Sequence, residues 1–225
     1  MNEQAIFIAI EGGDGSGKGT QTELLERNRI SLGKNVLRIS FPQYEKPSSY
    51  YSAEYLEGNY GGIDEVHPDL ASLAFAVDRL AAKQDILDSL ARGDDVLLDR
   101  YVASNLAHQG AKIHDKHARH AFYDRIMDLE YGTIGLPQPQ KNIVLLVPPS
   151  ISQENVDKKA ARSYTTKKRD IHEADALHLE YAKRNYEELC ELYPDLYTPI
   201  ECVEDGRMRS IEAIQQDIAD IIKSI

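Results

Sequence analysis

The stretch that decides the fold is residues 5–20, AIFIAIEGGDGSGKGT. Its first part, Ala5–Ile10, is an unbroken apolar run, which is typical of a strand buried on both faces of a parallel sheet. The second part matches the pattern GxxxxGK from Gly12 to Lys18, and a helical stretch from Thr20 to about Leu32 follows it. This pattern is specific when it lies between a buried strand and a helix. The stretch therefore predicts a phosphate-binding loop.

A loop of this kind curls so that successive amide N–H groups point at phosphate oxygens, and the next helix adds its positive N-terminal end. We expect Lys18 to reach the β- and γ-phosphates of ATP. Gly19 stands where a Ser or Thr commonly holds Mg²⁺, and the hydroxyl comes one residue later, at Thr20. The alternative is a glycine-rich turn without a ligand. The predicted ATP-binding residues are Gly12, Gly13, Asp14, Gly15, Ser16, Gly17, Lys18, Gly19 and Thr20.

The rest of the chain alternates apolar strand patterns with helical ones. Strands are expected at 35–40, 95–98, 143–147 and 197–203, and helices at 48–57, 69–92, 116–131, 170–191 and 211–225. This alternation predicts an α/β fold, a doubly wound parallel sheet of about five strands with helices on both faces, of the P-loop NTPase type. A chain of 225 residues fits a single domain, 1–225.

Composition excludes several classes of function. The formal net charge of -11 repels nucleic acid phosphates, so no nucleic acid partner is expected. No apolar run approaches the roughly 18 residues of a membrane span, so no membrane partner is expected. The first residues carry no basic signal-peptide head, so the expected location is cytoplasmic.

A second group of polar residues follows the apolar run at 95–98. Asp99 and Arg100 come directly after it, where the strand ends of an open parallel sheet line a ligand crevice. A carboxylate there can orient hydrated Mg²⁺, and a guanidinium offers a bidentate fork to a phosphate. Taken alone, the pair is equally compatible with a surface ion pair.

Four segments in order resemble the thymidylate kinases, a family of P-loop nucleoside monophosphate kinases. They are Phe7–Gln21, Phe41-Pro42, Phe75–Arg79 and Asp99–Asn105. The resemblance implies transfer of a phosphoryl group from ATP to dTMP, giving ADP and dTDP, with Mg²⁺. It also implies a homodimer, for which the apolar face of the 69–92 helix is available.

The resemblance also implies roles for individual residues. Phe75 would stack on thymine, while Arg79 and Asn105 would hydrogen-bond the base. Arg100 would grip the dTMP phosphate, and Asp14 would face the sugar 3′-hydroxyl. The implied dTMP site is Asp14, Phe41, Pro42, Tyr44, Phe75, Arg79, Arg100, Ser104, Asn105 and His108, and the implied metal site is Asp14, Thr20 and Asp99. His108 departs from the family, which often has Tyr there. Without the resemblance, Phe75 reads as a core residue and Arg79 as a solvated one.

Phosphoryl transfer needs cations beyond Lys18 and Mg²⁺. The loop interior, Gly13–Ser16, has no arginine, so the charge is expected from the basic stretch Lys158–Arg169, inside a mobile lid at about 150–170. The alternative is a solvated basic helix face. The predicted catalytic residues are Lys18, Asp99, Arg100, Arg162 and Arg169.

Two other functions stay open at this stage. One is a kinase for another nucleoside monophosphate or for a deoxynucleoside, because the sequence GKGT also occurs in adenylate kinase-like loops. The other is a regulatory nucleotide-binding module without transfer activity, because a P-loop fold alone does not specify chemistry.

Overall fold

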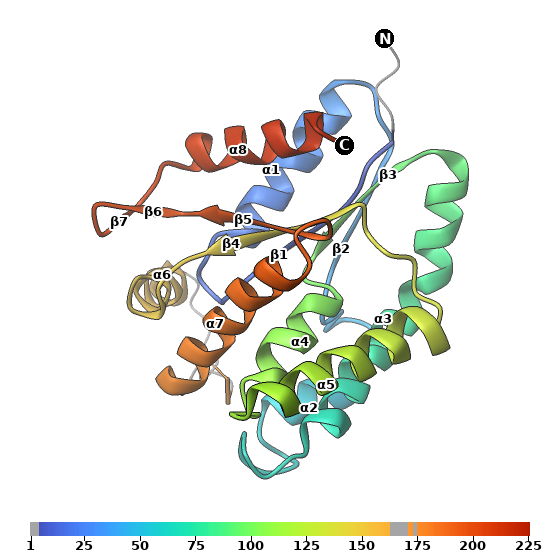
Figure 1. Cartoon of the computed structure of the whole chain (residues 1–225). Helices are drawn as coiled ribbons and strands as arrows, with labels where there is room; N and C mark the ends of the chain where they lie inside the picture. Colours follow the sequence, from blue (N-terminus) through green and yellow to red (C-terminus); the bar gives the residue numbers. More distant parts are fainter. Residues whose placement is uncertain (1–4, 163–170, 173–174) are drawn as a thin grey trace.

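The computed structural model describes residues 5–162, 171–172 and 175–225, and for 157–162 it describes the helical backbone only (Figure 1). Within these residues, the strands are β1 (Phe7–Gly12), β2 (Val36–Ser40), β3 (Asp95–Asp99), β4 (Lys141–Leu146), β5 (Tyr197–Glu201), β6 (Val203–Glu204) and β7 (Arg207–Met208). The helices are α1 (Lys18–Ser31), α2 (Tyr50–Leu56), α3 (Pro68–Arg92), α4 (Val102–Gly110), α5 (Lys116–Met127), α6 (Pro149–Arg162), α7 (Ala176–Leu192) and α8 (Ile211–Lys223), with a short 3₁₀ turn η1 (Pro47–Ser49) and a π-helical turn η2 (Asp128–Thr133).

The central sheet has five strands in the order β2-β3-β1-β4-β5, and all its neighbours are parallel. Every residue of β1 is buried, as its unbroken apolar run predicts. Successive side chains point to opposite faces, so Ile8 and Ile10 enter one core cluster while Phe7 and Ala9 enter another.

Helices cover both faces of this sheet. Figure 1 shows α1 and α8 on one face and α3, α4, α5 and α7 on the other, and the core clusters divide in the same way. The predicted doubly wound α/β fold of the P-loop NTPase type is therefore confirmed. None of the helices that the structure describes is long and apolar enough to cross a lipid bilayer.

Some predicted boundaries are wrong. The helix expected at 170–191 begins at Ala176, because Asp175 caps it by accepting the N–H groups of Leu177 and His178. Ile171 and His172 form a turn instead. The helix expected at 116–131 is α-helical only to Met127, where the π-helical turn η2 takes over.

Other elements were not predicted. Helix α4 has only 9 residues, and all of them except Ser104 are buried. Helix α6 was read only as part of a lid, and the last strand is shorter than expected because the hairpin β6–β7 follows it.

The register of the sheet places the two predicted groups of polar residues side by side. Ile10 of β1 pairs with Asp99 of β3, and Arg100 donates its N–H to the carbonyl of Ile10 at 3.0 Å. The phosphate-binding loop after β1 and the Asp99-Arg100 pair after β3 therefore share one edge of the sheet, where ligands of open α/β sheets bind.

Candidate active site

The loop between β1 and α1 has the form of an anion-binding cradle. Gly15 and Gly17 adopt left-handed conformations, with φ of 77° and 95°. Gly17 precedes the first residue of α1, so the first amide groups of that helix have no carbonyl partner within it. The Ser16 hydroxyl is buried and has no hydrogen-bond partner among the described residues. These features leave donors for phosphate oxygens.

Lys18 lies over this loop, and its ammonium donates to the Gly13 carbonyl at 2.7 Å. Burial and the neighbouring Arg100 lower the pKa of Lys18 to about 8, although Asp14 and Asp99 act in the opposite direction. A bound polyphosphate would place negative charge beside Lys18 and favour its protonated form. Helix α6 also contacts the loop, because Asn155 donates to the Gly15 carbonyl at 3.0 Å.

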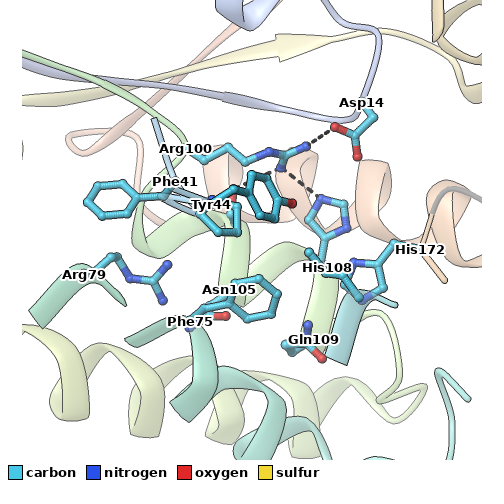
Figure 2. Close-up of a pocket in the computed structure, with 13 residues that line it drawn as sticks. Asp14, Phe41, Tyr44, Phe75, Arg79, Arg100, Asn105, His108, Gln109 and His172 are labelled. Carbon is cyan, nitrogen blue, oxygen red and sulfur yellow. Dashed lines mark hydrogen bonds and ion pairs between the residues drawn. The ribbon is translucent and has the colours of Figure 1, made fainter. Parts of the chain in front are cut away.

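Arg100 lies between the loop and a neighbouring pocket. Its Nη2 donates to Asp14 Oδ1 at 2.6 Å, and its Nη1 lies 3.2 Å from the Ser104 hydroxyl and 3.3 Å from His108 Nε2 (Figure 2). Partial burial raises the pKa of Asp14, but Arg100 and Lys18 outweigh it and hold that pKa well below its ordinary value. Asp14 is therefore ionised.

A pocket opens beside these residues. It is lined by Asp14, Phe41, Pro42, Tyr44, Leu56, Phe75, Arg79, Arg100, Ser104, Asn105, His108, Gln109 and His172. All ten residues of the predicted dTMP site line it, although they come from the phosphate-binding loop, the segment after β2, α3 and the β3–α4 region (Figure 2).

The end of the pocket away from Asp14 is built around a buried ion pair. Arg79 is 2% exposed, so it is not the solvated helix residue of the alternative interpretation. Glu130 of η2 accepts from Arg79 Nη2 at 2.7 Å and from Asn105 Nδ2 at 2.8 Å. Phe75 is half-buried beside them and meets the Tyr55 ring edge-on, with centroids 6.0 Å apart.

Two buried histidines, His108 and His172, line the pocket, and a third, His178, lies next to them; one nitrogen atom from each lies within 4.8 Å of the other two. Burial lowers the pKa of each, to about 4 for His178. A guanidinium only donates, so the Arg100 contact places the His108 proton on Nδ1 and occupies Nε2. In this tautomer, His108 has no free lone pair for a metal, and the positive charge of Arg100 opposes a cation.

A second fully buried carboxylate, Glu11, lies in β1 directly before the loop. Glu11, fully buried at the end of β1, accepts from the Tyr101 N–H at 2.6 Å, from the Ser104 hydroxyl at 2.7 Å and from the Tyr186 hydroxyl at 3.1 Å. Burial raises its pKa, although Ser104 and Arg100 act in the opposite direction. Glu11 thereby ties β1 to the start of α4.

Oxygen ligands suited to Mg²⁺ flank the loop. A Cβ added at Gly19 would lie 3.4 Å from Asp99 Oδ2, so the Asp99 carboxylate faces the position after Lys18. Thr20 is exposed nearby at the start of α1, whereas Asp14 is already engaged by Arg100. Carboxylate and hydroxyl oxygens are the ligands that Mg²⁺ prefers, so Asp99 and Thr20 fit the ion better than Asp14 does.

The described residues do not include the side chains of two arginines that were predicted to be catalytic. Arg169 lies outside the described residues, and Arg162 is described only as the last residue of α6, without its side chain. Their catalytic roles stay predictions. Conversely, sequence reasoning missed Glu130, Gln109 and the position of His172 in the pocket. No sequence signal indicated Glu130, because the burial of Arg79, which requires a carboxylate partner, is known only from the structure.

A P-loop, an adjoining acceptor pocket and an arginine between them, at the strand ends of a parallel sheet, define a phosphotransferase of the nucleoside monophosphate kinase class.

Comparison with known proteins specifies the family. The sequence profile of the family described as "Thymidylate kinase" matches residues 10–205. A thymidylate kinase of Mycobacterium tuberculosis (strain CDC 1551 / Oshkosh) is 36% identical over 173 residues, which cover 76% of this chain and 79% of that protein. A thymidylate kinase of Halalkalibacterium halodurans is 25% identical over 225 residues, covering 99% of this chain and 96% of its own. The chain belongs to the thymidylate kinase family.

Proposed function

We propose that this enzyme transfers the γ-phosphoryl group of ATP to dTMP, giving dTDP and ADP, a step in dTTP synthesis. The observation that carries the proposal is the pocket of Figure 2, where base-binding groups, Arg79 and Asn105, lie at one end and a phosphate-binding arginine, Arg100, at the other. The Arg100 guanidinium also contacts the ATP loop, because its Nη2 donates to Asp14. One pocket thus has room for a nucleotide acceptor with its phosphate directed at the donor site.

The reaction proceeds by direct in-line transfer. The loop amides and Lys18 hold the ATP phosphates, and Arg100 holds the acceptor phosphate, so the two reactants are fixed in position before transfer. Negative charge spreads over the moving group, and the cations around it stabilise that charge. A phosphate acceptor is already ionised, so the reaction requires no general base.

Mg²⁺ is the proposed cofactor. When bound, it would neutralise charge on the ATP phosphates. Asp99 and Thr20 are the residues that would hold it, in part through water, because Gly19 offers no hydroxyl.

Residues 150–170 are proposed to act as a lid of the single domain, with Arg162 and Arg169 as its catalytic cations. Helix α6, which begins this segment, already contacts the ATP loop through Asn155. Arg162→Ala and Arg169→Ala are expected to lower turnover far more than dTMP affinity, measured by kcat and by the dissociation constant. Unchanged turnover in both variants would exclude the two arginines.

A homodimer is proposed through α3. Leu70, Leu73, Val77 and Leu80 are 62%, 42%, 44% and 47% exposed and follow one helical stripe. Light scattering after gel filtration is expected to show a dimer that Leu73→Glu converts to a monomer. Leu192→Glu, an exposed leucine of α7, is the matched control and should stay dimeric. A wild-type monomer would refute the proposal.

A cytoplasmic location is also proposed. Cys190 and Cys202 are both free and buried, which fits a reducing compartment.

The direct test is ADP release from Mg-ATP by purified protein offered dTMP, dUMP, AMP, CMP, GMP and thymidine separately. The expected result is turnover that depends on dTMP and disappears in Lys18→Ala. Preference for another acceptor would keep the kinase class but overturn the acceptor, and silence with all six would favour a binding module.

A further inference from the structure

Glu130 is a fully buried carboxylate whose two oxygens are both occupied. Oε2 accepts from Arg79 Nε, and Oε1 accepts from Arg79 Nη2 and Asn105 Nδ2. The two residues that face the acceptor base are therefore held by one common group, which itself does not line the pocket. Its place is behind the base-binding end rather than within it.

This arrangement settles the orientation of the Asn105 amide. Nδ2 has two hydrogens, and it donates one to the Ser72 carbonyl at 3.1 Å and the other to Glu130 Oε1 at 2.8 Å. Both partners can only accept, so the amide cannot flip without losing both bonds. Asn105 Oδ1 receives no hydrogen bond from the described residues, and Asn105 lines the pocket. Asn105 Oδ1 therefore presents a hydrogen-bond acceptor to the pocket.

Arg79 completes the pattern. Three of its five N–H groups are directed at protein acceptors, two at Glu130 and one at the Tyr101 carbonyl, 3.4 Å from Nη1. Two N–H groups remain, and a guanidinium has no acceptor. Figure 2 shows the Arg79 guanidinium and the Asn105 side chain at the same end of the pocket. Arg79 therefore presents a hydrogen-bond donor to the pocket, beside the acceptor of Asn105.

We propose that Glu130 is the positioning residue that sets base specificity, by holding Asn105 and Arg79 so that the pocket presents one acceptor beside one donor. Thymine and uracil match this pair, because N3–H donates and O4 accepts. Cytosine reverses both contacts, because its N3 accepts and its 4-amino group donates. Glu130 therefore selects against cytosine nucleotides without touching the base.

The substitution Glu130→Gln breaks this arrangement whichever way the new amide is turned. If its NH₂ faces Asn105, that side chain must flip and present a donor to the pocket. If its NH₂ faces Arg79, two donors meet and the guanidinium must move. Either outcome removes the fixed acceptor–donor pair.

The inference rests on the proposed thymine nucleotide acceptor, so the test measures binding rather than turnover. Dissociation constants of dTMP, dUMP and dCMP are determined by calorimetry, with dCMP by displacement of dTMP. Two reversed buried contacts predict that the wild type binds dTMP at least about 100-fold more tightly than dCMP. In Glu130→Gln, the dTMP:dCMP ratio is expected to fall at least about tenfold, whereas the dTMP:dUMP ratio stays constant, because thymine and uracil share the same polar edge.

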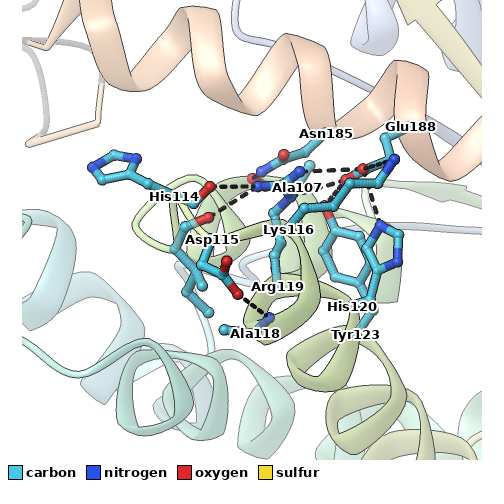
Figure 3. A network of polar contacts seen from close by, with 11 residues as sticks. Ala107, His114, Asp115, Lys116, Ala118, Arg119, His120, Tyr123, Asn185 and Glu188 are labelled. Carbon is cyan, nitrogen blue, oxygen red and sulfur yellow. Dashed lines mark hydrogen bonds and ion pairs between the residues drawn. The ribbon is translucent and has the colours of Figure 1, made fainter.

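A matched control comes from a similar ion pair elsewhere. Arg119 of α5 donates in a fork to Glu188 of α7 at 2.9 and 3.1 Å (Figure 3), and neither residue lines the pocket. Glu188→Gln should leave all three dissociation constants unchanged. Glu130→Asp, which keeps two acceptor oxygens, should weaken dTMP binding but retain discrimination against dCMP, and it carries the test if Glu130→Gln yields no soluble protein.

The outcomes separate the two proposals. A wild type that binds dTMP selectively but does not phosphorylate it overturns the proposed function and leaves the role of Glu130 intact. An unchanged dTMP:dCMP ratio in Glu130→Gln, loss of that ratio in Glu130→Asp, or parallel loss of the dTMP:dUMP ratio overturns the role of Glu130.

Discussion

Replacing Arg100 by Lys and by Met separates the charge of this side chain from its shape. Arg100 has a left-handed backbone with φ of 68°, and Lys and Met carry the same conformational cost there as Arg does. The comparison therefore isolates the head group. The guanidinium now bonds to Asp14 at 2.6 Å and to Ser104 at 3.2 Å, which shows that it reaches two partners at once.

The expected magnitude follows from the number of bonds to the acceptor phosphate. A charged hydrogen bond contributes about 1.5–3 kcal/mol, and a guanidinium fork forms two with one phosphate. Lys keeps the charge but forms one such contact, so the dTMP KM should rise about 10- to 100-fold. Met forms none, so kcat/KM for dTMP should fall about 100-fold or more.

The assay is steady-state ADP release with dTMP varied at saturating Mg-ATP, and then with ATP varied. The ATP KM should change little, because Arg100 faces the acceptor pocket. Arg119→Lys alters the guanidinium fork to Glu188, a pair that does not line the pocket, and should leave both constants unchanged. A kcat/KM for dTMP within twofold of the wild type in Arg100→Met would refute the role of Arg100.

Three further predictions concern the ATP loop. The pKa of Lys18 is lowered to about 8 without nucleotide, and bound ATP should raise it. ATP binding at pH 8.5 should therefore take up a proton in the wild type but not in Lys18→Ala, as measured by calorimetry in buffers of different ionisation enthalpy. Equal proton uptake in both proteins would contradict this prediction. Gly19→Ser adds a hydroxyl near Asp99, because a Cβ at position 19 lies 3.4 Å from Asp99 Oδ2. This variant should lower the Mg²⁺ concentration for half-maximal turnover about two- to tenfold, whereas a rise would refute this placement. Gly15→Ala should lower the melting temperature and the ATP affinity more than Gly17→Ala does. Both glycines have positive φ, but only a Cβ at position 15 would meet the α6 backbone, 2.1 Å from the Ser152 carbonyl oxygen. Equal effects of the two variants would contradict this contact.

The parts of the fold that could be predicted are those with local signals. The apolar run of β1 and the glycine pattern after it place the ATP loop without any knowledge of the rest of the chain. Asp99 and Arg100 follow a second apolar strand, and the parallel register brings them to the same edge. The resemblance grouped Phe75 with residues on other elements, and the structure places them all in one pocket.

Features that depend on distant contacts could not be predicted. Glu130 stands in a polar stretch that reads as surface, yet it is fully buried because Arg79, 51 residues earlier, requires a partner. His172 was assigned to a helix, but the cap at Asp175 starts that helix later and leaves His172 in a turn against the pocket. Neither outcome leaves a period or motif in the sequence.

The central claim is that this protein moves a phosphoryl group from ATP to dTMP, and the most direct measurement follows that group. Protein in excess over ATP labelled at the γ-phosphorus is mixed with Mg²⁺ and dTMP, and the products are separated after one turnover. The account predicts the label in dTDP, with no dTDP formed by Lys18→Ala. Label that stays in ATP, or that appears only as inorganic phosphate, would contradict it.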